Sequence, residues 1–298
     1  MPERGHSTRD ISPRPSPSTS VGEADVHGVT SQERVTLDVD VLRRLGERAG
    51  VQTWPVVLDL WAAHSDFDDH AAATVGADQT IGELGLLDGG EPTGWLAAAL
   101  RVLSAPERQL EIRTMPASPG PTGGIQRICL ARNGHDHVLA RREGSRIEIG
   151  RPAVTQATEL GAIVAREFGE AVGADIAGFS APADELATRL AHCRNSNDTA
   201  DALHALGAPS SDAIAMASAL MSCHARSEIV AVSWTGGACA QSSGALAVFD
   251  TDRGRIVASP SKSPDGRVWT TLSPGSGHRI GQAIGLLIET LPEGRWMP

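Results

Sequence analysis

The sequence predicts an α+β protein, in which runs of antiparallel strands are kept apart from groups of helices. One observation is the polar turn Asn133-Gly134, which lies between two apolar runs and is typical of a β-hairpin. The other is a repeated order of elements, because four strands followed by a helix are predicted at 109–168 and again at 228–291. No residue-level identity relates the two blocks, so the duplication depends on the order of elements alone.

Composition narrows the classes of function. The chain has 298 residues, of which 41% are hydrophobic, enough for one large domain or two small ones. Its net charge is -10 and it contains no tyrosine, so neither phosphate contacts nor stacking on nucleic-acid bases are expected. No stretch of about 18 apolar residues predicts a membrane span, and the first residues lack the apolar centre of a signal peptide. We therefore predict a cytoplasmic protein with no nucleic-acid partner and no membrane insertion.

The elements of the first hundred residues follow from capping and periodicity. Residues 1–31 are rich in proline, serine and charge, a composition that predicts a disordered tail. A strand at 34–37 precedes Asp38, whose carboxylate can cap a helix that ends at Gly50. Further along, the pattern predicts a strand at 54–60, a helix at 66–84 and a helix that begins at Pro92.

The middle of the chain predicts a strand meander and then short helices. The four strands are expected at 109–114, 124–132, 135–141 and 146–150. A helix at 152–168 follows them, with its apolar residues on one face. Three short helices are then predicted between 181 and 223, the first of them starting at Pro182, and a strand follows at 228–235.

The best-defined hairpin lies at 245–260. An apolar run is followed by Asp250-Thr251-Asp252-Arg253-Gly254, where aspartate oxygens can accept bonds from the backbone ahead and glycine tolerates positive φ. Residues 256–258 are apolar again, and Pro260 is expected to stop the pairing. A third strand at 267–272 leads to a C-terminal helix. The apolar residues at helical spacing in that helix are Ile280, Ile284, Leu287 and Leu291.

Asp250 and Asp252 also allow an enzyme hypothesis. Phosphotransferases of the haloacid dehalogenase type place a nucleophilic aspartate and an acid-base aspartate two residues apart, at the end of a buried strand. Fewer than ~50 residues follow this pair, too few for the further strand ends that carry the rest of such a site. We therefore predict a hairpin turn here. A phosphotransferase-like hydrolase that uses Asp250 and Asp252 is the alternative.

Other candidate chemistry is incomplete. His135 and His137 would point the same way on a strand, but two ligands without a carboxylate or cysteine cluster do not make a metal site. Cys223 and His224 would diverge by about 100° on a helix end, so they would not form a nucleophile-base pair. The four cysteines include no CxxC pair, and no Walker or Rossmann glycine pattern occurs. We predict no catalytic residue, no metal and no cofactor.

Five segments, taken in order along the chain, carry a family resemblance. They are Trp54-Pro55-Val56-Val57-Leu58, Glu83-Leu84-Gly85-Leu86-Leu87, Val248-Phe249-Asp250-Thr251-Asp252-Arg253-Gly254-Arg255-Ile256, Trp269 followed by Ser273-Pro274-Gly275-Ser276, and Leu291-Pro292-Glu293-Gly294-Arg295-Trp296. Each segment is short, but their order over 35–296 resembles the EspG family, the cytosolic chaperones of type VII (ESX) secretion in mycobacteria and related actinobacteria.

The resemblance implies both a fold and a function. The fold would be a twisted antiparallel sheet in a single domain at 32–298, with two similar subdomains at about 32–170 and 171–298 and a C-terminal helical bundle. Family members have no enzymatic activity. They bind the apolar tip of PPE proteins in PE-PPE heterodimers, keep them soluble and target them to the secretion system. A weak homodimer is a second interaction to test.

Two regions are predicted to contact the PPE tip, on sequence and family grounds. The loop at 115–124 combines apolar side chains with glycines that keep it adjustable. The short alanine-rich helices at 182–222 carry leucine and methionine residues that suit an adaptable apolar patch. The predicted partner-binding residues are Met115, Pro116, Pro119, Thr122, Gly123, Leu203, Met216, Leu220 and Met221.

Overall fold

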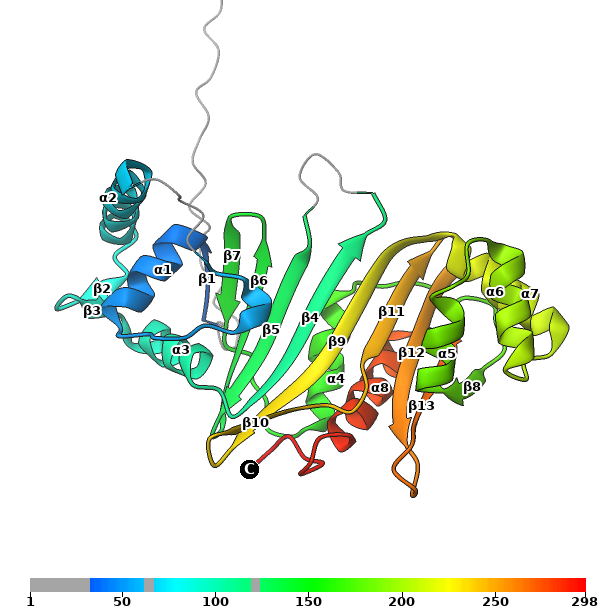
Figure 1. The fold of residues 1–298 in the computed structure, drawn as a ribbon. Coiled ribbons are helices and arrows are strands. Elements are labelled where there is room, and N and C mark those ends of the chain that lie inside the picture. The colour runs from blue at the N-terminus through cyan, green and yellow to red at the C-terminus, as the bar shows by residue number, and fades with distance from the viewer. Residues whose placement is uncertain (1–32, 62–66, 119–123) are drawn as a thin grey trace, which may run out of the picture. The chain divides into compact units, whose positions relative to one another are not determined.

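The computed structural model describes residues 33–61, 67–118 and 124–298 (Figure 1). The helices in this part of the chain are α1 (Val39–Arg48), α2 (Phe67–Glu83), α3 (Gly94–Ser104), α4 (Thr158–Glu167), α5 (Ala183–Leu190), α6 (Ser196–Ala205), α7 (Ser210–Met221) and α8 (Gly277–Glu289), with a 3-10 turn η1 (Val56–Leu58). The strands are β1 (Arg34–Asp38), β2 (Leu87–Asp88), β3 (Glu91–Pro92), β4 (Arg108–Pro116), β5 (Gln126–Asn133), β6 (Asp136–Glu143), β7 (Arg146–Gly150), β8 (Phe179–Pro182), β9 (Cys223–Thr235), β10 (Ala238–Gln241), β11 (Leu246–Thr251), β12 (Gly254–Lys262) and β13 (Val268–Pro274).

One large antiparallel sheet organises these elements and confirms the predicted α+β class. The strand order is β1-β7-β6-β5-β4-β9-β11-β12-β13-β8, and β10 pairs with β9. Strands β2 and β3 form a separate small hairpin. The tail at 1–31 that the sequence predicts to be disordered lies outside the described residues.

The sheet has the same plan on both sides of its centre. In the first half a first strand, β1, is separated by helices from a four-strand meander, β4 to β7, and α4 follows. In the second half β8 is separated by α5, α6 and α7 from β9, β11, β12 and β13, and α8 follows. The two halves meet where β4 pairs with β9. The helical bundle therefore lies inside the second half, between its first strand and its meander.

The two faces of the sheet bury different cores. On one face α4 and α8 cover the centre, with Leu160, Val164 and Ile284 packed against strands of both halves. These two helices approach closely, since a Cβ on Gly161 would lie 2.5 Å from the Cα of Gly281. On the other face α1 and α3 cover strands β5 to β7 and α2 packs on α1, while α5, α6 and α7 cover β11 to β13 (Figure 1).

Local capping and turn chemistry produce several elements as predicted. Asp38 caps α1 by accepting a hydrogen bond of 3.0 Å from the backbone N–H of Asp40. In the hairpin, Asp250 pairs with Arg255 and Thr251 with Gly254. Gly254 has φ of +103°, in the region that favours glycine. Asp250 and Gly254 thus belong to a β-hairpin, as the sequence predicts.

Pro260 does not end strand pairing, contrary to the prediction. Pairing between β11 and β12 does stop near it, at Ala247 and Ala258. Strand β12 nevertheless continues beside β13 as far as Lys262, with Pro260 opposite Thr270. Because Pro260 lies beyond the last β11 pair, it has a strand neighbour on one side only, and edge positions tolerate proline.

The predicted strand at 54–60 is wrong: this segment forms the turn η1. Val57 and Leu58 are consecutive and both fully buried, which alternation along a strand would not allow. The side chain of Arg142 donates hydrogen bonds to the carbonyls of Leu58 (2.8 Å) and Asp59, so these groups need no strand partner. Two smaller corrections concern Pro92, which lies in β3 ahead of α3, and Pro182, which ends β8.

Candidate functional site

Strands β4 and β9 have one face over which Figure 1 shows no α-helix, and the 3-10 turn η1 contacts β4 on that face. The register pairs Glu111 with Val230 and Arg113 with Glu228, and opposed residues of antiparallel strands point to the same side. We call this surface the central open face. It consists of Gln109, Glu111, Arg113 and Met115 from β4, and Arg226, Glu228, Val230, Val232 and Trp234 from β9. It lies between the α1–α3 group and the α5–α7 group.

The structure brings the two predicted partner-binding regions together at one end of this face. Met115 and Pro116 are half-buried at the end of β4. Pro116 pairs with Ala225, and the N–H of Ala117 donates a 2.8 Å hydrogen bond to the carbonyl of His224. Strand β9 begins two residues after Met221, the last residue of α7. The start of the 115–124 loop and the end of α7 therefore flank neighbouring strand ends, although about 100 residues separate them in sequence.

The predicted residues of the helical bundle differ in exposure. Leu203 and Met216 are fully buried in the core between the bundle and the sheet, so neither presents surface to a partner. Leu220 is partly buried against the same core. Met221, in contrast, is 52% exposed. Ile214 is 61% exposed and was missed by the sequence analysis. It lies seven residues before Met221, a spacing that places both on one side of a helix.

The remaining predicted residues of the loop, Pro119, Thr122 and Gly123, lie outside the described residues. The described part of the loop begins with Ala117 and Ser118, which are both exposed.

Charged side chains lie along the central open face, beside the buried Val230 and Val232. Glu111 is the most buried of its carboxylates, and burial raises its pKa above the ordinary value while Arg113, 3.8 Å away, acts in the opposite direction. Cys129 on β5 lies beside Glu111 on the same side of the sheet, and burial and this carboxylate raise the pKa of its thiol well above the ordinary value. Arg226 and Glu228 are exposed. The face therefore offers charges of both signs between its two ends.

The groups considered for catalysis or metal binding have structural partners. Asp250 accepts a 2.6 Å hydrogen bond from Arg255, whereas Asp252 is exposed at the turn. The Nδ1 of buried His137 donates to the carbonyl of His135, and its Nε2 accepts from the indole N–H of Trp296 at 3.0 Å. Among the described residues, no group of three His, Cys, Asp or Glu side chains could hold a metal ion.

Comparison with known proteins decides the family. A profile described as the EspG family matches residues 38–285. The chain belongs to the EspG family. This membership supports the prediction that the chain is not an enzyme, and it removes the basis for the phosphotransferase alternative at Asp250 and Asp252.

Curated relatives agree with this assignment over most of their length. The chain is 28% identical over 267 residues to the ESX-1 secretion-associated protein EspG1 of Mycobacterium tuberculosis, covering 88% of this chain and 89% of the relative. It is 25% identical over 265 residues to the ESX-3 secretion-associated protein EspG3 of Mycolicibacterium smegmatis, covering 89% of each.

Among solved structures, the fold matches the Mycobacterium tuberculosis type VII secretion system chaperone EspG5, determined in complex with the PE25-PPE41 dimer. The TM-score is 0.73 at 19% identity, over 89% of this chain and 99% of that one. This likeness shows that the two proteins share a fold. In the described residues of the EspG-family chain, no helix is long and apolar enough to cross a membrane.

Proposed function

We propose that this EspG-family chain is a cytoplasmic chaperone that binds the apolar tip of a PPE protein within a PE-PPE heterodimer. It keeps the pair soluble and delivers it to the type VII secretion system. Family membership supports this function, and so does the fold shared with EspG5, a chaperone whose solved complex contains a PE-PPE dimer.

One observation supports a docking place at the end of the central open face that carries Met115. Met115 and Pro116 at the end of β4 lie beside the start of β9, which directly follows the exposed Met221 of α7. An apolar PPE tip needs an apolar receptor, because burial contributes about 25 cal/mol per Å² before the costs of association. Met221 and Ile214 provide such a surface, and methionine adapts to varied partners.

The charged centre of the face complements this apolar end. Arg113 and Glu228 are opposed across β4 and β9, and Arg226 lies opposite Met115. Charges at the rim of an interface set orientation and partner choice more than they set affinity. We propose that they select among PE-PPE pairs, while the apolar end binds the tip that such proteins share.

Coexpression tests the proposal. The chain is produced with each PE-PPE pair of its own genome, and at least one pair should co-purify with it. Replacing both Ile214 and Met221 by glutamate should reduce capture of that pair by more than about tenfold, because apolar anchors carry most of the energy of an interface. The melting temperature should not change, since both side chains are exposed.

Val172→Glu is the matched control, because Val172 is 83% exposed and belongs to neither predicted region. It should capture the pair as the unchanged chain does. Deletion of 116–123 should abolish capture and leave the circular dichroism spectrum unaltered. Full capture by the double variant and by the deletion would place the interface elsewhere, and failure to capture any pair would contradict the function itself.

Two further expectations about organisation are part of this proposal. We propose that 32–170 and 171–298 are subdomains of one domain, which the matching strand order of the two halves supports. We also propose that self-association is weak, and sedimentation velocity at two protein concentrations tests it.

A further inference from the structure

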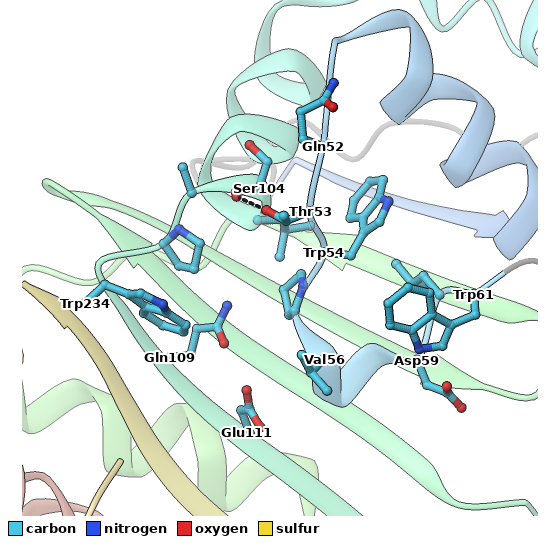
Figure 2. A pocket seen from close by; sticks show the side chains of 15 residues that line it. Gln52, Thr53, Trp54, Val56, Asp59, Trp61, Ser104, Gln109, Glu111 and Trp234 are labelled. Atoms are coloured by element: carbon cyan, nitrogen blue, oxygen red, sulfur yellow. Dashed lines mark hydrogen bonds between the residues drawn. The ribbon is translucent and has the colours of Figure 1, made fainter. Parts of the chain in front are cut away.

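A groove of about 620 Å³ lies at the other end of the central open face (Figure 2). Its walls come from the segment between α1 and α2, from the end of α3 and from the strands β4 and β9. The lining residues that matter here are Trp54, Val56, Trp61, Gln109, Glu111 and Trp234. Four residues separate Glu111 from Met115 along β4, or about 13 Å at the rise of a strand. The groove therefore lies away from the apolar end proposed to bind the PPE tip, although Glu111 is also next to the charged centre of the face.

Three tryptophans are among the residues that line the groove. Half of the six tryptophans in the sequence, Trp54, Trp61 and Trp234, gather around it (Figure 2), although Trp234 is far from the other two in sequence. Trp61 is 74% exposed, and the neighbouring Val56 is 68% exposed. Large apolar side chains that gather at the surface mark a place where a partner can bury them. Two proline rings, those of Pro55 and Pro106, also line the groove.

Contacts with the sheet and with α3 fix the segment that carries Trp54 and Trp61. Arg127 binds the carboxylate of Asp59 at 2.9 Å, and Arg142 donates to the carbonyls of Leu58 and Asp59. Asp59 has φ of +52°, a conformation uncommon outside glycine that persists only where the surroundings enforce it. Thr53 also donates a 2.9 Å hydrogen bond to the carbonyl of Ser104 in α3. A wall held in this way lowers the cost of ordering on binding.

The charge in the groove is of one sign. Of the described residues that line it, only Asp59 and Glu111 are charged, and both are acidic. Asp59 is already paired with Arg127, whereas Glu111 has its cationic neighbour Arg113 at 3.8 Å. A cationic group of a ligand that reached Glu111 would pair with a partly desolvated carboxylate, where such a contact is stronger than in water.

We propose that this groove binds an extended, proline-rich segment of a protein partner, with a basic residue of that segment paired to Glu111. Grooves lined by aromatic rings recognise polyproline II segments, which are already extended and lose little entropy on binding. The rings of Trp61 and Trp234 would pack against prolines, while Trp54 packs on Gly46 of α1 and supports its wall. The single sign of charge selects a basic neighbour. This binding is additional to the proposed chaperone function, because it uses the opposite end of the face.

The test uses the full chain and a synthetic nine-residue peptide of eight prolines with one central arginine. Tryptophan emission should change saturably as this peptide is added. The same peptide with glutamate in place of arginine should bind more weakly, and Glu111→Gln should remove the difference between the two peptides. Trp61→Ala should weaken binding of the arginine peptide at least about tenfold, as loss of an aromatic anchor does.

Trp269→Ala is the matched control, since Trp269 lies on β13, outside the groove, and its loss should leave peptide affinity unchanged. Trp61 is exposed, so its variant should fold, and its melting temperature verifies this. The proposal is overturned by the lack of a saturable response, by equal affinity in Trp61→Ala, or by tighter binding of an amphipathic helical peptide of equal length. Capture of PE-PPE pairs by Trp61→Ala is measured separately and should be unchanged. A failure of the peptide-binding proposal is therefore distinguishable from a failure of the chaperone proposal.

Discussion

Replacing Arg255 with methionine removes a buried guanidinium that joins β12 to the neighbouring strand β11 and to the end of α4. Its Nε donates to Asp250 at 2.6 Å, and its two terminal nitrogens donate to the carbonyls of Gly169 (2.9 Å) and Phe168 (2.7 Å). The guanidinium carbon also lies 5.9 Å from the centroid of the Phe168 ring. Arg255 is 4% exposed, so water does not reach these groups freely.

The structure sets the size of the expected effect. Breaking a buried charge pair by removing one partner costs about 3–5 kcal/mol, because the other charge loses its partner. Asp250 keeps some contact with solvent, and a methionine fills part of the volume, so we expect the lower end of this range, about 3 kcal/mol. For a domain of this size, such a loss lowers the melting temperature by roughly 6–10 °C.

Urea and thermal unfolding of Arg255→Met measure this loss directly. Arg253→Met is the matched control, because Arg253 is a neighbouring arginine that is exposed on the turn, and its stability should change by no more than about 0.5 kcal/mol. The reasoning is refuted if Arg255→Met loses less than about 1 kcal/mol, or if both variants lose the same amount. Asp250→Asn should likewise act on stability, which distinguishes a structural aspartate from a nucleophile.

Two further predictions concern backbone and pH. Gly254→Val should reduce the free energy of unfolding by more than the roughly 1–2 kcal/mol of a left-handed conformation alone, because its Cβ would lie 2.8 Å from the backbone of Ala174. Gly50→Val is the control, because Gly50 also has positive φ but lies in open space. Equal losses of unfolding free energy in the two variants would contradict this reasoning. Burial lowers the pKa of His137 below its ordinary 6.5, so the unfolded chain binds the proton more readily and stability should fall as pH drops below about 6.5. Protonation of His137 at Nε2 would also remove the hydrogen bond from Trp296, which lowers the stability in the same direction. Melting curves of the unchanged chain and His137→Gln between pH 5 and 8 should converge toward low pH, and parallel curves would show that His137 is not the titrating group.

Features that the sequence predicts well are those decided within a few residues. Asp38 caps α1 because the accepting carboxylate and the donating N–H are two residues apart. The turns at Asn133-Gly134 and at 250–254 follow from residues that tolerate their backbone angles. The order of strands in each meander follows from such turns, and with it the α+β class.

The candidate site required the tertiary structure. Which element covers a strand cannot be read from the strand itself, so Leu203 and Met216 were predicted as partner contacts although they lie in a core. The edge strand β8 was missed because it is short and is defined by its pairing with β13. The family resemblance directed attention to the 115–124 loop and the helical bundle, and the pairing of β4 with β9 showed that the two regions adjoin.

The sequence by itself therefore determined the local turns, the caps, the order of elements and the family to which the chain is similar. Only the tertiary structure decided which of these elements became neighbours: Glu111 lies opposite Val230, and Trp54 shares a groove with Trp234. Hydrophobic burial is non-directional, so an apolar pattern predicts that a residue is buried but does not predict which residues it contacts. That choice is made when strands distant in sequence pair across the sheet, where each backbone hydrogen bond fixes a register and each register fixes a face.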